Sequence, residues 1–240
     1  MTTAVILAAG TATRLRPLTN NIPKCLLKVG GKSLLQRNLE SLKDNCIQRV
    51  VIVTGFLEEM IHAAVRSMNL GLEVEFITNP AYDQTNNNHS LWLARPAVSG
   101  HDIVLLDADI LFDRRILSHL LASTHDDALV IRRSDSLGHE EIKCELDAND
   151  AVLHIGKHLD PRTSAGESLG IEKFSAHTST KLFDVLSRRH VINEFYEASF
   201  QEVIDAGATI YAVDSRGLPC AEIDTPDDLQ HADELAKKLT

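Results

Sequence analysis

The residues most able to do chemistry begin with a group of cations near the N-terminus. No acidic residue precedes Glu40, although the chain has 34 acidic and 24 basic residues and a net charge of −10. The basic residues of this stretch are Arg14, Arg16, Lys24, Lys28, Lys32 and Arg37. They follow an apolar segment, 4–8, and a loop that opens at Gly10. Loop N–H groups and long cations can together neutralise several phosphate oxygens, so this stretch predicts a nucleoside triphosphate site.

Carboxylates form the second group of candidates. Asp107 and Asp109 come directly after an apolar segment, 103–106, that is typical of a buried strand. Ligands of open α/β sheets bind beyond the carboxyl ends of the strands, where two carboxylates are well placed to hold Mg²⁺. Asp107 could instead hydrogen-bond the loop. An Asp-x-Asp pattern after a strand also occurs in nucleotide-sugar glycosyltransferases.

The elements that must position these residues begin as alternating strands and helices. Ser33 predicts the N-cap of a helix whose apolar residues recur with helical spacing at Leu35, Leu39, Leu42 and Cys46. Apolar runs predict strands at 49–54, 72–77, 103–106 and 128–132. Helices are expected between them at 57–68, 91–97 and 114–122. This order indicates parallel pairing of the strands, with helices on the faces of the sheet.

The second half of the chain departs from this alternation. Segments 142–146 and 151–155 flank a turn at 147–150 and predict an antiparallel β-hairpin. The remaining elements are expected as a strand from Gly166, a helix from a Ser175 cap to Arg189, a helix opening within 193–198, strands at 209–213 and 221–223, and a last helix that begins with Thr225, Pro226 and Asp228. We expect one α/β domain over 1–240, a Rossmann-like three-layer fold with a mostly parallel mixed central sheet and a small antiparallel substrate-binding section.

The basic loop carries a longer pattern, L-A-A-G-x-x-x-R-L-x-P-L-T-x-x-x-P-K, from Leu7 to Lys24. Neither G-x-x-x-x-G-K-[ST] nor G-x-G-x-x-G occurs, so a P-loop and a dinucleotide fingerprint are excluded. The pattern resembles the signature of nucleotidyltransferases that join an NTP to a phosphorylated small molecule. That resemblance implies that Arg14 and Lys24 hold the phosphates that leave as pyrophosphate. It also implies nucleotide contacts from Leu7, Ala8, Ala9, Gly10, Thr11, Ala12 and Thr13. Many members have glycine where this chain has Ala12, so the backbone there is expected to differ.

Residues 85–94, T-N-N-N-H-S-L-W-L-A, form a polar run that leads into an expected helix. Sugar nucleotidylyltransferases usually have a Pro-x-Gly-x-Ala pattern here, which this chain lacks. The run instead resembles the corresponding segment of cytidylyltransferases that act on phosphocholine and on aminoalkylphosphonates. Amides and a hydroxyl can supply donors and acceptors for a pyrimidine edge. The resemblance implies nucleotide contacts from Asn87, Ser90 and Asp107 and an acceptor contact from Trp92. A loop followed by a helix N-cap explains the same residue types.

The same resemblance assigns the metal ligands and part of the acceptor site. Asp109 matches an acidic residue that binds Mg²⁺ in that family. Asp224, in E-I-D-T-P-x-D-L, matches a second such residue. The alternative for Asp224 is a structural role in capping the following helix. Lys157 matches a lysine that meets the acceptor phosphate or the α-phosphate. Glu167, in G-E-x-x-G-I, matches a residue at the acceptor's cationic end.

Segment 193–198 alternates acidic and aromatic side chains, with Glu194 and Tyr196 among them. Carboxylate attraction and aromatic faces suit a quaternary ammonium or amine group, so both residues are candidates for acceptor binding. Aromatic residues on a helix are equally typical of a hydrophobic core, and Lys157 is equally typical of an exposed loop. Both interpretations stay open at this stage.

Taken together, these residues indicate a Mg²⁺-dependent cytidylyltransferase that transfers CMP from CTP to a small phosphorylated or phosphonylated amine. A sugar-1-phosphate nucleotidylyltransferase would share the N-terminal loop but lacks support from 79–90. A nucleotide-sugar-dependent glycosyltransferase would explain Asp107 and Asp109 but leaves the basic loop without a purpose. A nucleotide sensor would bind CTP without releasing pyrophosphate.

Composition limits the partners. The net charge of −10 argues against general nucleic-acid binding, and no apolar run approaches the ~20 residues of a membrane helix. The cysteines are scattered, without Cys-x-x-Cys spacing, and no secretory signal is evident, which together indicate a cytoplasmic protein. The expected partners are therefore CTP and a small anionic acceptor. A homodimer is compatible with the sequence.

Overall fold

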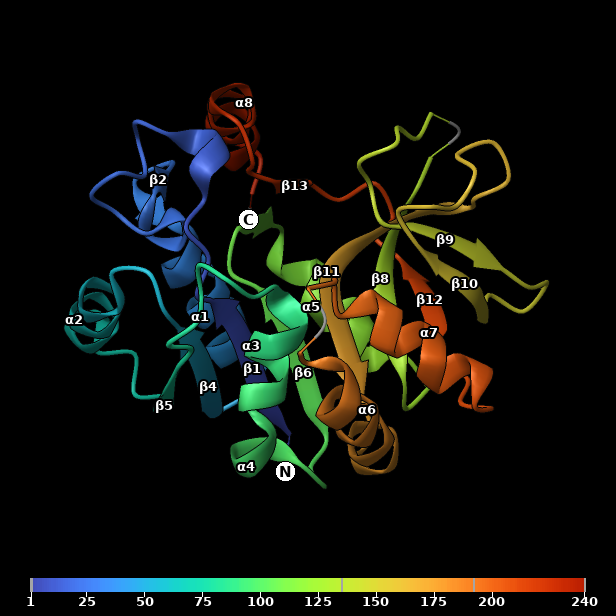
Figure 1. Cartoon of the computed structure of the whole chain (residues 1–240). Helices are drawn as coiled ribbons and strands as arrows, with labels where there is room; N and C mark the ends of the chain where they lie inside the picture. Colours follow the sequence, from blue (N-terminus) through green and yellow to red (C-terminus); the bar gives the residue numbers. More distant parts are fainter. Residues whose placement is uncertain (1, 135, 192, 240) are drawn as a thin grey trace.

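The computed structural model describes residues 2–134, 136–191 and 193–239. A nine-stranded mixed sheet forms the centre of this described part of the chain (Figure 1). Its parallel half consists of β6 (Ile103–Asp107), β1 (Thr3–Ala8), β4 (Arg49–Thr54) and β5 (Glu73–Thr78), which lie side by side in that order. The apolar runs identified from the sequence are these strands. In the described part of the chain, no helix is long and apolar enough to cross a bilayer.

The other half of the sheet is largely antiparallel, as the hairpin pattern predicted. Strand β11 (Gly166–Phe174) runs antiparallel to β6, and β8 (Ala128–Arg133) runs antiparallel to β11. The hairpin of β9 (Lys143–Leu146) and β10 (Val152–Gly156) joins β11 through β9, and β12 (Tyr211–Asp214) lies parallel to β8. The mostly parallel section with an adjoining antiparallel section confirms the predicted fold class.

Helices cover both faces of the sheet because the buried side chains of each strand alternate between two hydrophobic clusters. Ala4, Ile6 and Ala8 of β1 pack with helices α1 (Leu34–Asp44), α2 (Glu58–Met68) and α5 (Arg114–Ala122). Val5 and Leu7 face the opposite cluster, formed with α3 (Asn87–Leu93), α4 (Arg95–Val98), α6 (Ala176–Arg189) and α7 (Glu197–Asp205). The result is the three-layer arrangement visible in Figure 1.

One predicted helix was placed wrongly. A single helix was expected at 91–97, but α3 begins at Asn87 and a separate short helix, α4, follows it. The side chain of Asn86 caps α3 by accepting a hydrogen bond from the N–H of Asn87 (2.8 Å). Pro96 lies in the first turn of α4, where its missing N–H is tolerated. The polar run therefore forms the first turn of a helix instead of an extended loop.

A small ladder outside the main sheet was missed by the sequence patterns. Strand β7 (Ile110–Phe112) pairs antiparallel with β13 (Cys220–Glu222), so Ile110 lies opposite Glu222. The N–H of Ile223 also donates to the carbonyl of Asp109 (3.2 Å). This pairing brings the end of β6 close to the start of α8 (Pro226–Ala236), although the two are far apart in the sequence.

The N-terminal loop and α8 pack together through a third hydrophobic cluster. The loop contains the short helices η1 (Thr13–Leu15) and η2 (Lys24–Leu26), followed by the two-residue strands β2 (Lys28–Val29) and β3 (Lys32–Ser33). Leu15, Ile223 and Ala232 are among the buried residues of this cluster. The basic loop is therefore held against the segment that carries Asp224.

The start of α8 gives a stability prediction. Thr225 Oγ1 accepts from the N–H of Asp228 (3.2 Å), and the Asp228 carboxylate accepts from the N–H of Thr225 (2.7 Å), which forms the predicted capping box. We expect Thr225→Ala to lower the free energy of unfolding by about 1 kcal/mol, because one helix N–H loses its partner. Urea denaturation measures this change. Thr180→Ala, at an exposed position in α6, is the control, and an equal effect of both substitutions would contradict the capping role.

Candidate active site

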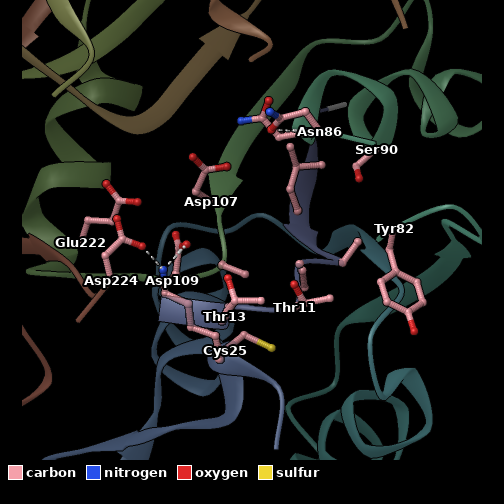
Figure 2. A pocket seen from close by; sticks show the side chains of 18 of the residues that line it. Thr11, Thr13, Cys25, Tyr82, Asn86, Ser90, Asp107, Asp109, Glu222 and Asp224 are labelled. Carbon is pink, nitrogen blue, oxygen red and sulfur yellow. Dashed lines mark hydrogen bonds and ion pairs between the residues drawn. The ribbon is translucent and has the colours of Figure 1, made fainter. Parts of the chain in front are cut away.

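A cavity of about 360 Å³ lies where β1 and β6 end (Figure 2). All twelve residues that the sequence assigned to nucleotide binding line it, and so do both proposed metal ligands, Asp109 and Asp224. The sequence assigned no site role to the other lining residues, although three of them lie within the segments 85–94 and 193–198. They are Cys25, Tyr82, Thr85, Asn86, Ala108, Phe195 and Glu222. In Figure 2 the acidic side chains gather on one side, while Tyr82 and Ser90 lie on the other.

The loop after β1 is shaped by one left-handed residue. Ala12 has φ of 48°, a conformation that glycine adopts more easily, which fits the glycine found there in many proteins with this signature. The Thr19 hydroxyl donates to the carbonyl of Ala12 (2.8 Å), and the N–H of Leu15 donates to the same oxygen (3.1 Å). These bonds hold the turn so that Thr11, Thr13 and Arg14 surround the cavity.

Lys24 lies between the two carboxylates that were expected to bind metal. Its Nζ is 2.8 Å from Asp109 Oδ2 and 2.6 Å from Asp224 Oδ1, and Arg14 reaches Asp224 Oδ2 at 2.6 Å. Burial alone would lower the pKa of Lys24, but the two carboxylates outweigh it and raise that pKa above the ordinary range. Burial would likewise raise the pKa of Asp224, whereas Lys24 and Arg14 lower it. Asp224 is therefore held as a carboxylate.

A third carboxylate completes this group. One oxygen each of Asp109, Glu222 and Asp224 lies within 4.8 Å of the others. Desolvation, followed by the negative charges of Asp109 and Asp224, raises the pKa of Glu222 to about 8, although part of its side chain stays exposed. Alternation along the predicted strand 221–223 could have revealed it, because it places Glu222 and Asp224 on the same side. Oxygen donors of this kind suit Mg²⁺, so the residues fit such an ion.

The opposite side of the cavity carries uncharged polar groups. Asn87 Oδ1 accepts from the N–H of Tyr196 (2.9 Å), and Ser90 Oγ accepts from Asn79 Nδ2 (3.1 Å). A Cβ at Gly55 would lie 2.7 Å from Tyr82 Cβ and 2.9 Å from the carbonyl of Ala9, so glycine allows Tyr82 to approach the loop. These contacts fix a polar wall next to the end of β1.

The structure separates the residues proposed for acceptor binding from this cavity, whose described lining includes none of them. Trp92 stacks on His190 with ring centroids 3.7 Å apart. Glu194 forms ion pairs with Arg189 (2.7 and 2.8 Å).

The other acceptor candidates are also engaged with neighbouring residues. Glu167 is buried and pairs with Arg132 (2.7 Å), and burial raises its pKa despite that arginine. Tyr196 is fully buried and donates to Asp107 Oδ2 (2.9 Å), so its ring belongs to the core. Lys157 lies 4.8 Å from the ring centroid of Phe195, which does line the cavity. Acceptor binding by these residues stays a prediction.

The ion pairs of Lys24 give a prediction about metal affinity. Its ammonium group occupies the position between Asp109 and Asp224, so it competes with a divalent cation for the same oxygens. We expect Lys24→Met to tighten Mn²⁺ binding by about tenfold in the absence of nucleotide, which is about 1.4 kcal/mol. Isothermal titration calorimetry measures the affinity, and Lys28→Met, at an exposed position in the same loop, should leave it unchanged. Equal or weaker Mn²⁺ binding by Lys24→Met would show that no such competition exists.

Comparison with known proteins agrees with this geometry. Residues 4–158 match the family described as the MobA-like NTP transferase domain. The chain is 28% identical to CMP-5'-(3-aminopropyl)phosphonate synthase of Streptomyces rubellomurinus over 244 residues. The aligned region covers 96% of this chain but only 38% of that protein. It is 27% identical to choline-phosphate cytidylyltransferase of Streptococcus pneumoniae, with 98% of each chain covered.

Solved structures share the same fold. The inositol-1-phosphate CTP transferase from T. maritima superposes with a TM-score of 0.82 at 22% identity, over 99% of this chain and 97% of that one. This likeness concerns the fold, whereas the family match spans well over half of the chain and includes the whole basic loop. The chain therefore belongs to the family of MobA-like NTP transferase domains and is a nucleotidyltransferase.

Proposed function

We propose that this protein is a Mg²⁺-dependent cytidylyltransferase that transfers CMP from CTP to a small phosphorylated or phosphonylated amine. The observation that carries the proposal is the division of one cavity into two sides. Cations and carboxylates converge on one side, through Arg14, Lys24, Asp109 and Asp224. Uncharged amide and hydroxyl groups occupy the other side. A triphosphate fits the first side and a base fits the second.

The reaction needs positioning and charge stabilisation. An acceptor oxygen, already ionised at neutral pH, attacks the α-phosphorus of CTP and forms the new P–O bond. The bond from the α-phosphorus to the bridging oxygen breaks, and pyrophosphate leaves with the electron pair. Arg14 and Lys24 neutralise the charge on this leaving group, because both side chains can reach the phosphates from the cavity wall. No covalent enzyme intermediate is required.

A divalent ion would be held by Asp109, Asp224 and Glu222. When bound, Mg²⁺ supplies Lewis-acid stabilisation of charge on the phosphate oxygens. The triphosphate brings negative charge of its own, which attracts Lys24 and Arg14 away from the carboxylates that they contact here. Lys157, beside Phe195 at the edge of the cavity, supplies positive charge for the incoming acceptor phosphate and reduces repulsion between the two anions.

The choice of CTP is supported by the polar wall and by the relatives. Asn86, Asn87 and Ser90 line the cavity and offer amide and hydroxyl groups, which suit the edge of a pyrimidine. Two of the curated relatives are a choline-phosphate cytidylyltransferase and a CMP-aminopropylphosphonate synthase, so both act with a cytidine nucleotide and a phosphorus-containing amine. These names favour an acceptor of the same chemical class.

Substrate specificity tests the proposal. Pyrophosphate release is measured with Mg²⁺ and each of the four NTPs, against phosphocholine, phosphoethanolamine, 2-aminoethylphosphonate and glucose-1-phosphate. We expect release with CTP and an amine-bearing acceptor. Release with glucose-1-phosphate instead would identify a sugar nucleotidylyltransferase, and nucleotide binding without release from any pair would indicate a sensor.

Removal of the carboxylate charges tests the metal ligands. We expect Asp109→Asn and Asp224→Asn each to lower kcat by at least about 10²-fold, because the ion that stabilises the transition state loses a charged ligand. Asp227→Asn, at an exposed position in the first turn of α8, is the matched control and should retain activity. Circular dichroism verifies the fold of each variant. Wild-type rates in either of the first two variants would remove that residue from the metal site.

A further inference from the structure

The start of α3 and the residues just before it form one wall of the cavity. Thr85, Asn86, Asn87 and Ser90 all line it, so their side chains are accessible to a ligand. Figure 2 shows Asn86 and Ser90 close to each other, on the side away from the acidic group. The hydrogen bonds that these side chains make within the protein determine which groups remain for a base.

Backbone N–H groups fix the orientation of both amides. Asn86 Oδ1 accepts from the N–H of Asn87 (2.8 Å), and Asn87 Oδ1 accepts from the N–H of Tyr196 (2.9 Å). A backbone N–H can only donate, so the atom that it contacts in each amide must be the oxygen. Neither amide nitrogen has a hydrogen-bond partner among the described residues. The groups left to a ligand are therefore the N–H donors of both amides.

A buried amide fixes the role of Ser90. Asn79 is 1% exposed, and its Oδ1 accepts from the N–H of Ala81 (2.9 Å), which fixes its own orientation. Asn79 Nδ2 donates to Ser90 Oγ (3.1 Å) and to Thr85 Oγ1 (3.1 Å). The Thr85 hydroxyl donates in turn to the carbonyl of Ala81 (2.8 Å). The hydroxyl hydrogen of Ser90 has no acceptor among the described residues, so it is left as a further donor.

This wall of the cavity therefore has spare donors, whereas each of its side-chain oxygens already accepts a hydrogen bond. We call Asn86, Asn87 and Ser90 the donor wall. Orphaned N–H groups are rarer in proteins than oxygens with a spare lone pair. The donor wall is therefore complementary to a ligand edge that presents acceptor atoms.

Cytosine presents such an edge, because its O2 and N3 are adjacent and both carry lone pairs. Uracil has an N–H at position 3 instead, so a donor of the wall would face another donor there. A desolvated donor that is left without an acceptor weakens binding by about 10–100-fold. The donor wall therefore distinguishes the two pyrimidines at position 3.

We propose that the donor wall selects CTP over UTP by donating hydrogen bonds to O2 and N3 of cytosine. This inference rests on the proposed cytidylyltransferase activity and adds to it the atoms of the base that are recognised. It assigns base selection to the hydrogens of Asn86, Asn87 and Ser90, and not to an oxygen that accepts from the 4-amino group.

Pyrimidine nucleotides that differ at one ring position test the inference. 3-Deaza-CTP keeps O2 and the 4-amino group but has C–H in place of N3. The triphosphate of 2-pyrimidinone riboside keeps O2 and N3 but lacks the amino group. With Mg²⁺ and the best acceptor of the panel, we expect kcat/KM for CTP to exceed that for 3-deaza-CTP and for UTP at least about tenfold, because a site built for a hydrogen bond rejects analogues that cannot form it. The 2-pyrimidinone nucleotide should be used better than 3-deaza-CTP.

The outcomes separate this inference from the proposed function. Equal use of CTP and 3-deaza-CTP, or better use of 3-deaza-CTP than of the 2-pyrimidinone nucleotide, would overturn the donor wall and leave the cytidylyltransferase activity standing. If no nucleotide releases pyrophosphate with any acceptor, the proposed function fails. The affinities of the same nucleotides, measured by calorimetry, then still test the donor wall.

Isosteric variants locate the selection. Asn86→Asp and Asn87→Asp each replace N–H donors by a carboxylate oxygen and keep an oxygen for the backbone N–H. Acidic residues are also favourable at the N-cap and in the first turn of a helix, so α3 should be retained. We expect each variant to lower the ratio of kcat/KM for CTP to that for UTP at least about tenfold, because a carboxylate accepts from the N3–H of uracil but cannot donate to N3 of cytosine.

Gln84→Glu is the matched control for these variants. It makes the same change from amide to carboxylate in the preceding loop, at an exposed position outside the cavity lining, and should leave the ratio unchanged. Circular dichroism verifies the fold of each variant. An equal loss with CTP and UTP, or an unchanged ratio in both wall variants, would contradict selection by the donor wall.

Discussion

The structure of the site depends on one set of ion pairs, those of Lys24 with Asp109 and Asp224. They join residues that are 85 and 200 positions apart in the sequence. Ion pairs that are largely removed from water gain little net stability, because desolvation offsets their attraction. Because they connect distant segments, these ion pairs hold the basic loop, the end of β6 and the start of α8 around one point.

The fold supplies the framework for that convergence. The parallel strands β1 and β6 deliver the basic loop and Asp109 to the same edge of the sheet, and the β7–β13 ladder delivers Glu222 and Asp224. The antiparallel section adds β11 next to β6, and Tyr196, just before α7, donates to Asp107. Asp107, at the end of β6, lies where the parallel and antiparallel sections of the sheet meet.

Sequence patterns predicted the elements whose signals are local. Strand 49–54 and helix 114–122 were placed correctly because apolar periodicity and caps lie within the segments themselves. The pairing of β7 with β13 could not be predicted, since it joins two short segments distant in the sequence. The stacking of Trp92 on His190 and the burial of Tyr196 are likewise tertiary contacts. The residues of the basic loop were placed at the cavity because a contiguous signature carries them, whereas Tyr82 reaches the cavity wall only through tertiary contacts.

We propose that Asp109, Glu222 and Asp224 hold a metal ion against a nucleotide while Lys24 moves to the phosphates. Crystals grown with Mn²⁺ and a non-hydrolysable CTP analogue test it most directly through the anomalous signal of manganese. We expect one strong peak bounded by these carboxylates, with Lys24 Nζ displaced toward the triphosphate and the base against Asn86 and Ser90. A peak elsewhere, or an analogue bound with Lys24 still between Asp109 and Asp224, would contradict it.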